Sequence, residues 1–318
     1  MPIGSPSPAL SGSSLPHPRG PTSGSGWLKW SFVGPTLLVL IAFNAYPLVY
    51  TVIHAFTDAD ITGGAWSWVG FDNFAQVFSN RTFAAKYGAA MRTTGLFVVL
   101  AVGIQLTLGF ILALALKKPF RGKTALLTLL LVPMMLSPAV MGLFWNLIFE
   151  GSYGPLNQVL ALFGLDHNQQ PVWRTDHRFL CLLIVDVWMW TPFMMLVSLA
   201  GLNAIPGSLY EAAEIDRASS WRVFTRITLP LCAPLLGLAV LLRATDALKQ
   251  FDLVMAITGP NQADTRTVSA LLYQIIFGNG KVGLGSAYAC VVLVVVIAMA
   301  TLFTRYLDWM QARQGRAG

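Results

Sequence analysis

Long apolar stretches alternate with short polar segments along most of this chain. A helix that crosses a membrane needs about 20 apolar residues to cover roughly 30 Å of hydrocarbon. Six stretches reach or approach that length: Trp30–Ile53, Thr93–Leu116, Thr124–Phe149, Phe179–Tyr210, Thr228–Leu242 with a continuation toward Ile257, and Val282–Thr304. The pattern predicts an all-α membrane protein with about six transmembrane helices.

The two ends of the chain differ from this pattern. Residues 1–26 are dominated by Pro, Ser and Gly and cannot bury apolar surface, so we expect them to be disordered. They also lack the basic start and apolar core of a signal peptide, so we expect no cleavage there. The expected organisation is a tail (1–26), a transmembrane domain (27–310) and a second tail (311–318).

Composition supports a membrane location. Of the 318 residues, 55% are hydrophobic and only 11% are charged, whereas soluble domains carry about 25% charged residues. In a soluble protein the net charge of +7 would indicate nucleic acid, but in a membrane protein it reports loop orientation. We therefore expect the lipid bilayer, and not nucleic acid, as a partner. The three cysteines lie in apolar stretches as free thiols, and the four scattered histidines predict no metal site.

Basic residues in the loops predict an orientation. An even number of spans places both termini on one side, and the loops on that side hold more Lys and Arg than the opposite loops. The strongest single anchor is the linker Lys117–Lys123. Both termini are therefore expected in the cytoplasm, together with the polar segment Glu211–Pro230.

That polar segment, part of a loop at about 204–229, predicts an ordered hairpin between the fourth and fifth spans. Its first part, Glu211–Asp216, consists mostly of good helix formers. Apolar residues follow at spacings of three, which predicts a stripe on a second helix: Trp221, Phe224 and Ile227. Pro230 suits the first turn of the next element.

The hairpin resembles the "EAA" cytoplasmic loop of ABC-importer permeases. That loop has E-A-A, a glycine four residues after the second alanine, and then I-x-L-P. Six positions match: Glu211, Ala212, Ala213, Ile227, Leu229 and Pro230. The glycine does not match, because Arg217 stands in its place. An arginine with positive φ at such a turn would cost about 1 kcal/mol relative to glycine.

Weaker matches extend the resemblance to most of the chain from about Phe32 onward. Gly70–Phe74 resembles the G-x-x-N-F motif after the first span of carbohydrate-type permeases. Further segments agree in order and spacing, among them Tyr153–Asn157 and Trp190–Phe193. Thr258–Pro260 follows as a shortened version of the glycine-rich form expected at that place. Each match alone is weak, but together with the hairpin they identify the chain as similar to the maltose/glycerol-phosphate type of permease.

The resemblance implies a bundle of the type I ABC-importer permease kind in the bacterial cytoplasmic (inner) membrane. It implies a second homologous permease subunit, two cytoplasmic ATPase subunits, and an extracytoplasmic solute-binding protein that delivers a sugar or polyol. ATP and Mg²⁺ would bind the partner ATPase, with no cofactor in this chain. Consistent with that, the sequence contains no G-x-x-x-x-G-K-[ST] phosphate loop, so we expect no enzyme activity of its own. The residues implied to couple to the ATPase are Glu211, Ala212, Ala213, Asp216, Arg217, Ile227, Leu229 and Pro230.

Polar and aromatic residues inside or at the end of two predicted spans indicate a candidate solute path. They are Asp186, Trp188 and Trp190 in the fourth span, and Arg243, Asp246, Lys249 and Gln250 in or after the fifth. An intramembrane charge costs about 2.5–3.5 kcal/mol on insertion scales, so such groups face the bundle interior or a water-filled path. The alternatives are structural: Arg243 and Asp246 neutralise each other, Asp186 forms an interhelical pair, and Trp188 packs against lipid or core.

Two other classes of function compete with the importer. One is a secondary transporter or channel that works without ATP, which a co-purifying ATPase would exclude. The other is an intramembrane enzyme, for which the sequence offers no H-E-x-x-H or G-x-S-x-G motif. The solute stays open between disaccharides, sugar alcohols and glycerol phosphate esters. A neutral one is favoured, because Arg243 lies beside Asp246 and offers little uncompensated positive charge.

Overall fold

The computed structural model describes residues 26–79, 81–164 and 172–314. Of the segment 1–26 that was expected to be disordered, residues 1–25 lie outside the described part, whereas Gly26 begins a helix. The helices in chain order are α1 (Gly26–His54), α2 (Asp72–Ser79), α3 (Arg81–Leu116), α4 (Lys123–Met135), α5 (Pro138–Ile148), α6 (Pro155–Leu162), α7 (Trp173–Asp176), α8 (Arg178–Ala204), α9 (Gly207–Ile215), α10 (Ser220–Val223), α11 (Leu229–Leu248), α12 (Asp252–Ile257), α13 (Val268–Tyr273) and α14 (Val282–Gln314). Two π-helical segments, η2 (Phe224–Thr228) and η3 (Gln274–Gly278), continue α10 and α13.

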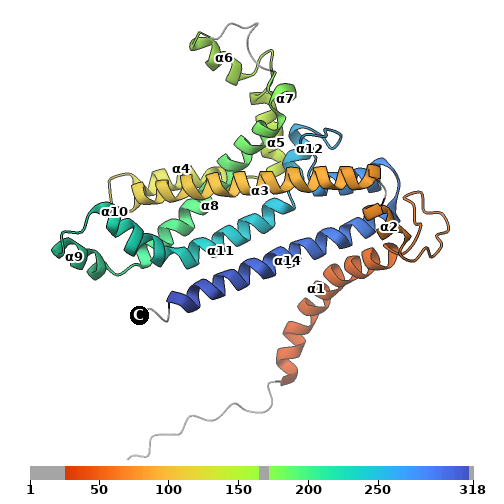
Figure 1. The fold of residues 1–318 in the computed structure, drawn as a ribbon, viewed down its shortest axis with the longest axis horizontal. Coiled ribbons are helices and arrows are strands. Elements are labelled where there is room, and N and C mark those ends of the chain that lie inside the picture. Colours follow the sequence, from red (N-terminus) through yellow and green to blue (C-terminus); the bar gives the residue numbers. More distant parts are fainter. Residues whose placement is uncertain (1–25, 80, 165–171, 315–318) are drawn as a thin grey trace, which may run out of the picture. The chain divides into compact units, whose positions relative to one another are not determined.

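The predicted all-α architecture is confirmed within the described residues. β-structure there is limited to two isolated bridges, Thr57 with Trp68 and Asp60 with Lys281. Five segments are long and apolar enough to cross a membrane, and α4 with α5 forms a sixth if the bent pair is one span. Figure 1 shows α3, α8, α11 and α14 as long helices, with α9 and α10 beyond one end of α8 and α11.

The third predicted span is broken. Helices α4 and α5 meet at 98°, between Met135 and Pro138. Pro138 disfavours the helical conformation for the preceding residue, and Ser137 is accordingly extended with ψ 135°. The uninterrupted helix expected over Thr124–Phe149 is therefore wrong in its middle, although the apolar length was read correctly.

Two other predicted spans end earlier than expected. The fourth does not reach Tyr210, because α8 ends at Ala204, where Pro206 holds Ile205 extended with ψ 124°. The fifth does not continue to Ile257, because α11 ends at Leu248 and Asp252–Ile257 forms the separate helix α12, which packs against α5. In both cases the sequence stays apolar beyond the residue at which the helix ends, so the apolar stretch is longer than the helix.

Helix α3 begins at Arg81, well before the predicted start at Thr93. Its added turns carry Tyr87, which packs against Tyr288 of α14 with ring centroids 4.4 Å apart. Ala90 is also buried there. The amphipathic start of α3 is therefore stabilised by packing that a search for uncharged stretches does not detect.

The core is centred on α3, α8 and α11. Its largest cluster contains Phe97 and Ala101 of α3, Val185 and Met189 of α8, and Ala239 of α11. Toward the α9 end, Gly109 allows α3 and α8 to approach closely, because a Cβ added there would lie 2.6 Å from Met194 Cβ. This tight packing carries the buried polar cluster described below.

The described residues fall into two units, one that ends at Tyr50 and one that begins at Thr51. In the first unit, the described residues belong to α1 and most of them expose apolar side chains, as expected for a helix that faces lipid. In the second unit, α14 continues to Gln314, into the segment expected as a tail.

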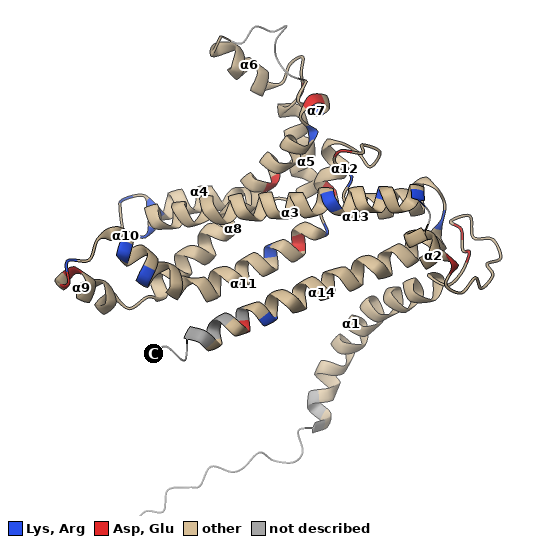
Figure 2. Ribbon diagram, in the orientation of Figure 1, with Lys and Arg blue, Asp and Glu red and all other residues tan. Residues whose placement is uncertain are grey.

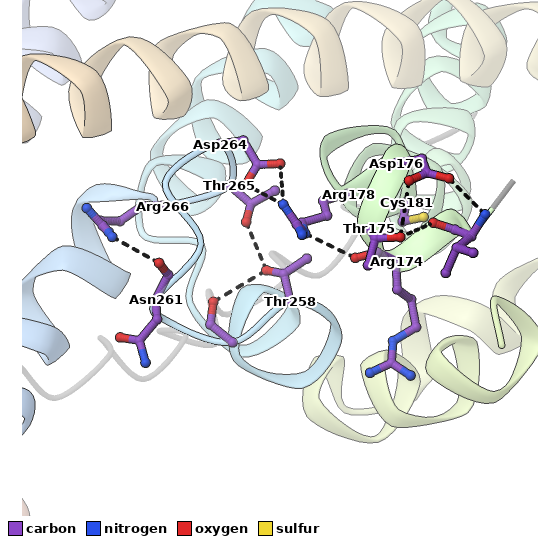
Figure 3. A network of polar contacts seen from close by, with 12 residues as sticks. Arg174, Thr175, Asp176, Arg178, Cys181, Thr258, Asn261, Asp264, Thr265 and Arg266 are labelled. Atoms are coloured by element: carbon purple, nitrogen blue, oxygen red, sulfur yellow. Dashed lines mark hydrogen bonds and ion pairs between the residues drawn. The ribbon is translucent and has the colours of Figure 1, made fainter. Parts of the chain in front are cut away.

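The start of α8 is joined to the loop after α12 by polar contacts (Figure 3). Arg178 Nη1 forms an ion pair with Asp264 at 3.4 Å, and Arg178 Nε donates to the Arg174 carbonyl at 3.1 Å. Thr265 Oγ1 lies 3.0 Å from Thr258 Oγ1 within the same loop. These contacts are at the opposite end of α8 from α9, so they close the far end of the bundle.

The G-x-x-N-F segment has a structural role. Asn73 is buried, and its Nδ2 donates to the carbonyl oxygens of Ala55 at 3.0 Å and Thr57 at 2.7 Å. Gly70 precedes it with φ 61°, a left-handed turn that glycine adopts without steric cost. The motif therefore ties α2 to the chain that follows α1.

Candidate functional site

The polar hairpin forms a compact unit of α9, the turn after it, and α10. Helix α9 follows Pro206 directly. Of the three residues of the E-A-A sequence, Ala213 is buried whereas Glu211 and Ala212 are exposed. Ile215 at the end of α9 is also exposed, by 83%. The helix thus presents a mixed polar and apolar face outside the bundle.

The turn after α9 places an arginine in a left-handed conformation. Arg217 has φ 51°, and it is the one non-glycine residue with positive φ in the described parts of the chain. The Ala218 N–H donates to the Ala213 carbonyl at 2.9 Å, and the Arg217 N–H donates to the Glu214 carbonyl at 3.0 Å. These two bonds define a Schellman helix end, in which glycine is the usual left-handed residue. The hairpin therefore keeps the turn that glycine would make, at a cost of about 1 kcal/mol.

The second half of the hairpin runs directly into the fifth span. Ser219 caps α10, its side chain accepting from the Arg222 N–H at 3.4 Å. The π-helical segment η2 follows, and the Leu229 N–H bonds to the Phe224 carbonyl. Pro230 lies in the first turn of α11, as predicted. Because proline has no N–H and crowds the preceding turn, a wider π turn beside it is a common adjustment.

The predicted apolar stripe on this second helix is divided between two environments. Phe224 and Ile227 pack against the core, and the Phe224 ring meets Phe110 of α3 edge-on at 6.0 Å. Trp221 is 73% exposed and stacks on Phe224 at 5.7 Å. The stripe therefore both anchors the hairpin to α3 and leaves one large aromatic ring outside.

The charges of the hairpin are separated along the chain. Its carboxylates, Glu211, Glu214 and Asp216, precede the turn, and its arginines, Arg217, Arg222 and Arg226, occupy the turn and the helix after it. Figure 2 shows the acidic residues on α9 and the basic residues on α10, while most of the length of α3, α8 and α14 carries no charge. Among the described residues that follow α8 in the chain, the hairpin is thus the structured segment with the highest density of charged side chains.

A buried polar cluster joins α8, α11 and α3. Asp186 on α8 has no exposed surface, and its two carboxylate oxygens accept from Arg243 Nη2 at 2.5 and 2.6 Å. Gln105 Nε2 donates to Asp186 Oδ2 at 2.8 Å, and Gln250 Nε2 donates to Oδ1 at 3.0 Å. Three side chains from separate segments therefore satisfy one buried carboxylate.

Arg243 is shared between a buried and an exposed carboxylate. Its Nη1 donates to Asp246 Oδ2 at 2.9 Å, and its guanidinium lies 4.8 Å from the centre of the Trp190 ring. The Arg243 side chain is 1% exposed, whereas that of Asp246 is 58% exposed. The cluster therefore reaches the surface of the chain through a carboxylate and not through a guanidinium.

The structure unites five of the seven predicted path residues: Asp186, Trp190, Arg243, Asp246 and Gln250. Trp188 lies elsewhere, its ring 5.5 Å from Trp145, where it lines an apolar cavity of about 640 Å³ between α3, α4 and α8. Lys249 is exposed just past the end of α11. Asp186 forms the interhelical pair that one structural alternative named, and its partner Arg243 lies closer to Asp186, at 2.5 Å, than to Asp246, at 2.9 Å.

Gln105 was missed in the sequence. The available signal was a lone amide in an uncharged stretch, Thr93–Leu116, since a polar side chain there needs an interhelical partner. Its Oε1 and the Arg243 Nε are both buried without a hydrogen-bond partner in the described chain.

As for metals, no group of three potential ligands comes together in the parts of the chain that are described.

Comparison with known proteins agrees with these features. Residues 105–314 match the family described as "Binding-protein-dependent transport system inner membrane component". The trehalose/maltose transport system permease protein MalF of Thermococcus litoralis is 33% identical over 87% of this chain and 92% of its own length. The trehalose transport system permease protein SugA of Mycobacterium tuberculosis is 29% identical over 87% of this chain and 88% of its own.

Solved structures show the same fold. A chain from a bacterial ABC transporter that imports the acidic polysaccharide alginate superposes with a TM-score of 0.75 at 22% identity, covering 89% of this chain and 95% of that chain. A chain from the alginate transporter in complex with its oligosaccharide-bound periplasmic protein gives 0.72 at 21% identity, with 87% and 92% covered. The resemblance inferred from the hairpin is therefore confirmed, and the chain belongs to the family of inner membrane components of binding-protein-dependent transport systems.

Proposed function

We propose that this chain forms, with a second related permease subunit, the translocation path of an ABC importer for a sugar or polyol. Two partner ATPase subunits bind ATP and Mg²⁺ and dock on the hairpins of the two permeases. An extracytoplasmic binding protein delivers the solute. Both termini and the hairpin lie in the cytoplasm of a bacterial cell whose inner membrane holds the chain.

The hairpin is the observation that carries this proposal. A cytosolic motor needs a rigid contact outside the bilayer, and the hairpin exposes Ile215 and Trp221 beside charged groups on well-formed helices. Its second half continues without a break into α11. Movement of the hairpin would therefore be transmitted to a membrane-spanning helix, which is how rigid-body switching operates. Nucleotide hydrolysis is assigned to the partner, because the sequence has no phosphate loop.

The charge distribution of the buried cluster supports an uncharged solute. Its one cation, Arg243, is enclosed and bound to Asp186 and Asp246. The charged group that reaches the surface is Asp246, which would repel an anion and accept hydrogen bonds from hydroxyl groups. The Trp190 ring lies against the Arg243 guanidinium, 4.8 Å from its centre, and so belongs to the same cluster. The names of the relatives, which include trehalose and maltose systems, point to the same class of solute.

The test is a charge reversal on the hairpin. The chain is reconstituted in vesicles with its partner permease, ATPase and binding protein, and sugar uptake and phosphate release are measured together. We expect Glu211→Lys to insert normally but to lose uptake while hydrolysis is no longer stimulated by the solute. The matched control is Asp308→Lys, the same charge reversal at an exposed site on α14. Normal coupled uptake by Glu211→Lys would contradict the coupling role.

Orientation needs a separate experiment. A cysteine at Ala212, which is exposed, is the better probe than one at the buried Ala213. In a background without native cysteines, an impermeant maleimide should label Ala212→Cys only after the cells are opened. Labelling in intact spheroplasts would place the hairpin outside and exclude contact with a cytosolic ATPase.

A further inference from the structure

A cleft of about 540 Å³ lies beside the hairpin, between the end of α3, helix α9 and the start of α10. Lys117 and Lys118 at the end of α3 line it, and Glu214 of α9 lines it from the hairpin. None of these three residues takes part in the cluster around Asp186. The cleft is therefore separate from the buried polar cluster around Asp186.

The charged lining favours an anion. Two lysines face a single carboxylate, so the cleft is net positive. Lys117 Nζ lies 3.9 Å from the centre of the Tyr210 ring, a cation–π contact that holds the lysine over the hairpin. A compact ammonium group of this kind is a common ligand for phosphate oxygens.

Hydroxyl groups add neutral hydrogen-bonding capacity. Tyr210 Oη and Thr228 Oγ1 lie 3.2 Å apart and both residues line the cleft, together with Ser220. The Ser220 hydroxyl is not needed for the cap of α10, because Ser219 supplies it. A phosphate ester with hydroxyl groups would find donors and acceptors here besides the lysines.

The remaining wall is apolar and is shared between the last turn of α3 and the second helix of the hairpin. Leu114 of α3 and Val223 and Phe224 of the second hairpin helix form it. An uncharged stretch that is long enough to cross the hydrocarbon ends at Leu116, directly before the lysines. The cleft therefore has a basic rim at the level of lipid headgroups and an apolar wall on the hydrocarbon side.

We propose that this cleft binds the headgroup and upper acyl chain of an anionic phospholipid in the inner leaflet. Basic pockets between membrane helices on the cytoplasmic side bind such headgroups through the phosphate. The apolar wall distinguishes a lipid from a free phosphate ester, which would gain nothing from it. A bound lipid would join α3 to the hairpin, so its presence would stiffen the element proposed to carry the coupling movement. The inference rests on the proposed orientation but not on the proposed solute.

The experiment measures lipid retention by native mass spectrometry on the purified transporter. Wild-type complex, equilibrated with equal amounts of phosphatidylglycerol and phosphatidylcholine of the same chains, should retain phosphatidylglycerol preferentially. Lys117→Gln with Lys118→Gln should lower that preference about 25-fold, since each lysine near an anionic headgroup contributes roughly fivefold. The matched control is Arg121→Gln with Arg305→Gln, which removes two exposed charges that do not line the cleft and should leave the preference unchanged.

A second variant separates the cleft from charge alone. Ser220→Phe would fill the cleft and keep both lysines, and it should also lower phosphatidylglycerol retention. Equal retention by the wild type and the double lysine variant would overturn the proposal. So would full displacement by water-soluble glycerol phosphate, which would identify a free phosphate ester as the ligand. Retention by the permease pair but not by the complex with ATPase would overturn it as well, because the cleft would then be a protein-docking surface.

Discussion

Arg243 and Asp186 are 57 positions apart in the sequence, yet their side chains meet inside the bundle with Nη2 2.5 Å from Oδ1. Each lies on a different long helix, α11 or α8, and neither side chain is more than 1% exposed. Removing one partner of such a buried ion pair leaves a buried charge without its counter-charge and is strongly destabilising, whereas replacing both partners with apolar residues is often nearly neutral. The pair therefore acts as a joint between the two helices, and its loss should be measurable.

The first prediction concerns that joint. Asp186→Leu should lower the free energy of unfolding by about 3–5 kcal/mol, because it removes the buried partner of Arg243 and leaves the enclosed guanidinium with only the exposed Asp246 as a counter-charge. The double variant Asp186→Leu with Arg243→Met should recover most of that loss. The measurement is the midpoint of SDS-induced unfolding in mixed micelles. The control is Asp246→Leu, which removes the exposed partner of Arg243 and should cost at most about 1 kcal/mol. A double variant as unstable as the single one would show that the pair is not a unit.

The second prediction concerns the approach of α3 to α8. Gly109→Ala should lower the free energy of unfolding by about 1–3 kcal/mol, because the new Cβ would meet Met194 Cβ at 2.6 Å and Met195 N at 2.7 Å. Gly103 is the matched control, since it lies on the same helix with nothing within 4 Å of an added Cβ. Gly103→Ala should be neutral or stabilising by up to about 1 kcal/mol. The same unfolding assay compares the two, and equal effects would contradict close packing at Gly109.

The third prediction concerns the left-handed arginine. Arg217→Gly should stabilise the hairpin by about 1 kcal/mol, because glycine adopts φ 51° without the steric cost of a Cβ. Arg217→Ala removes the same side chain but keeps the Cβ, so it should bring no such gain. Hydrogen exchange of the peptide that covers α9 and α10 measures the difference. If alanine slows exchange as much as glycine does, the turn is not strained in the way the backbone indicates.

The fourth prediction concerns pH at the loop between α1 and α2. The Ser67 hydroxyl and N–H both donate to Asp58, and these bonds hold the pKa of Asp58 below its usual value. A carboxyl group with a lowered pKa stabilises the folded loop above its unfolded pKa and loses that contribution as the pH falls through the folded value. Hydrogen-exchange protection of residues 56–71, corrected for the intrinsic rate, should therefore be constant from pH 7 to about pH 4 and fall below it. Asp58→Asn should abolish this pH dependence, and its persistence would assign the titration to another group.

Much of the architecture followed from local pattern. The uncharged stretches revealed the number and order of the spans, because a membrane requires a continuous run of apolar residues whatever the neighbours are. The places where the prediction was wrong share a cause. Pro138 and Pro206 bend or end helices inside apolar sequence, and hydropathy does not register backbone geometry. Conversely, α3 extends to Arg81 because its polar first turns pack against α14, a contact between distant segments.

In the candidate site, too, some contacts could be predicted from the sequence and others depend on how the helices pack. Arg243 and Asp246 could be paired from the sequence, because three residues along a helix face one another. The closer partner, Asp186, and the amide donor, Gln105, could not be assigned, since their meeting depends on how α3, α8 and α11 pack. Trp188 was placed with the cluster because it is near Asp186 in sequence, but its side chain faces a different cavity.

The sequence by itself determined that this chain spans a membrane, how many apolar spans it has and in what order, and which permease family its hairpin resembles. All three rest on local composition and spacing, which act without reference to the rest of the fold. Only the tertiary structure decided which carboxylate holds Arg243, where α8 and α11 end, and that Arg217 adopts a left-handed turn. These features depend on contacts between residues that are distant in sequence and on local backbone geometry. The pattern of apolar residues along the chain contains information about neither.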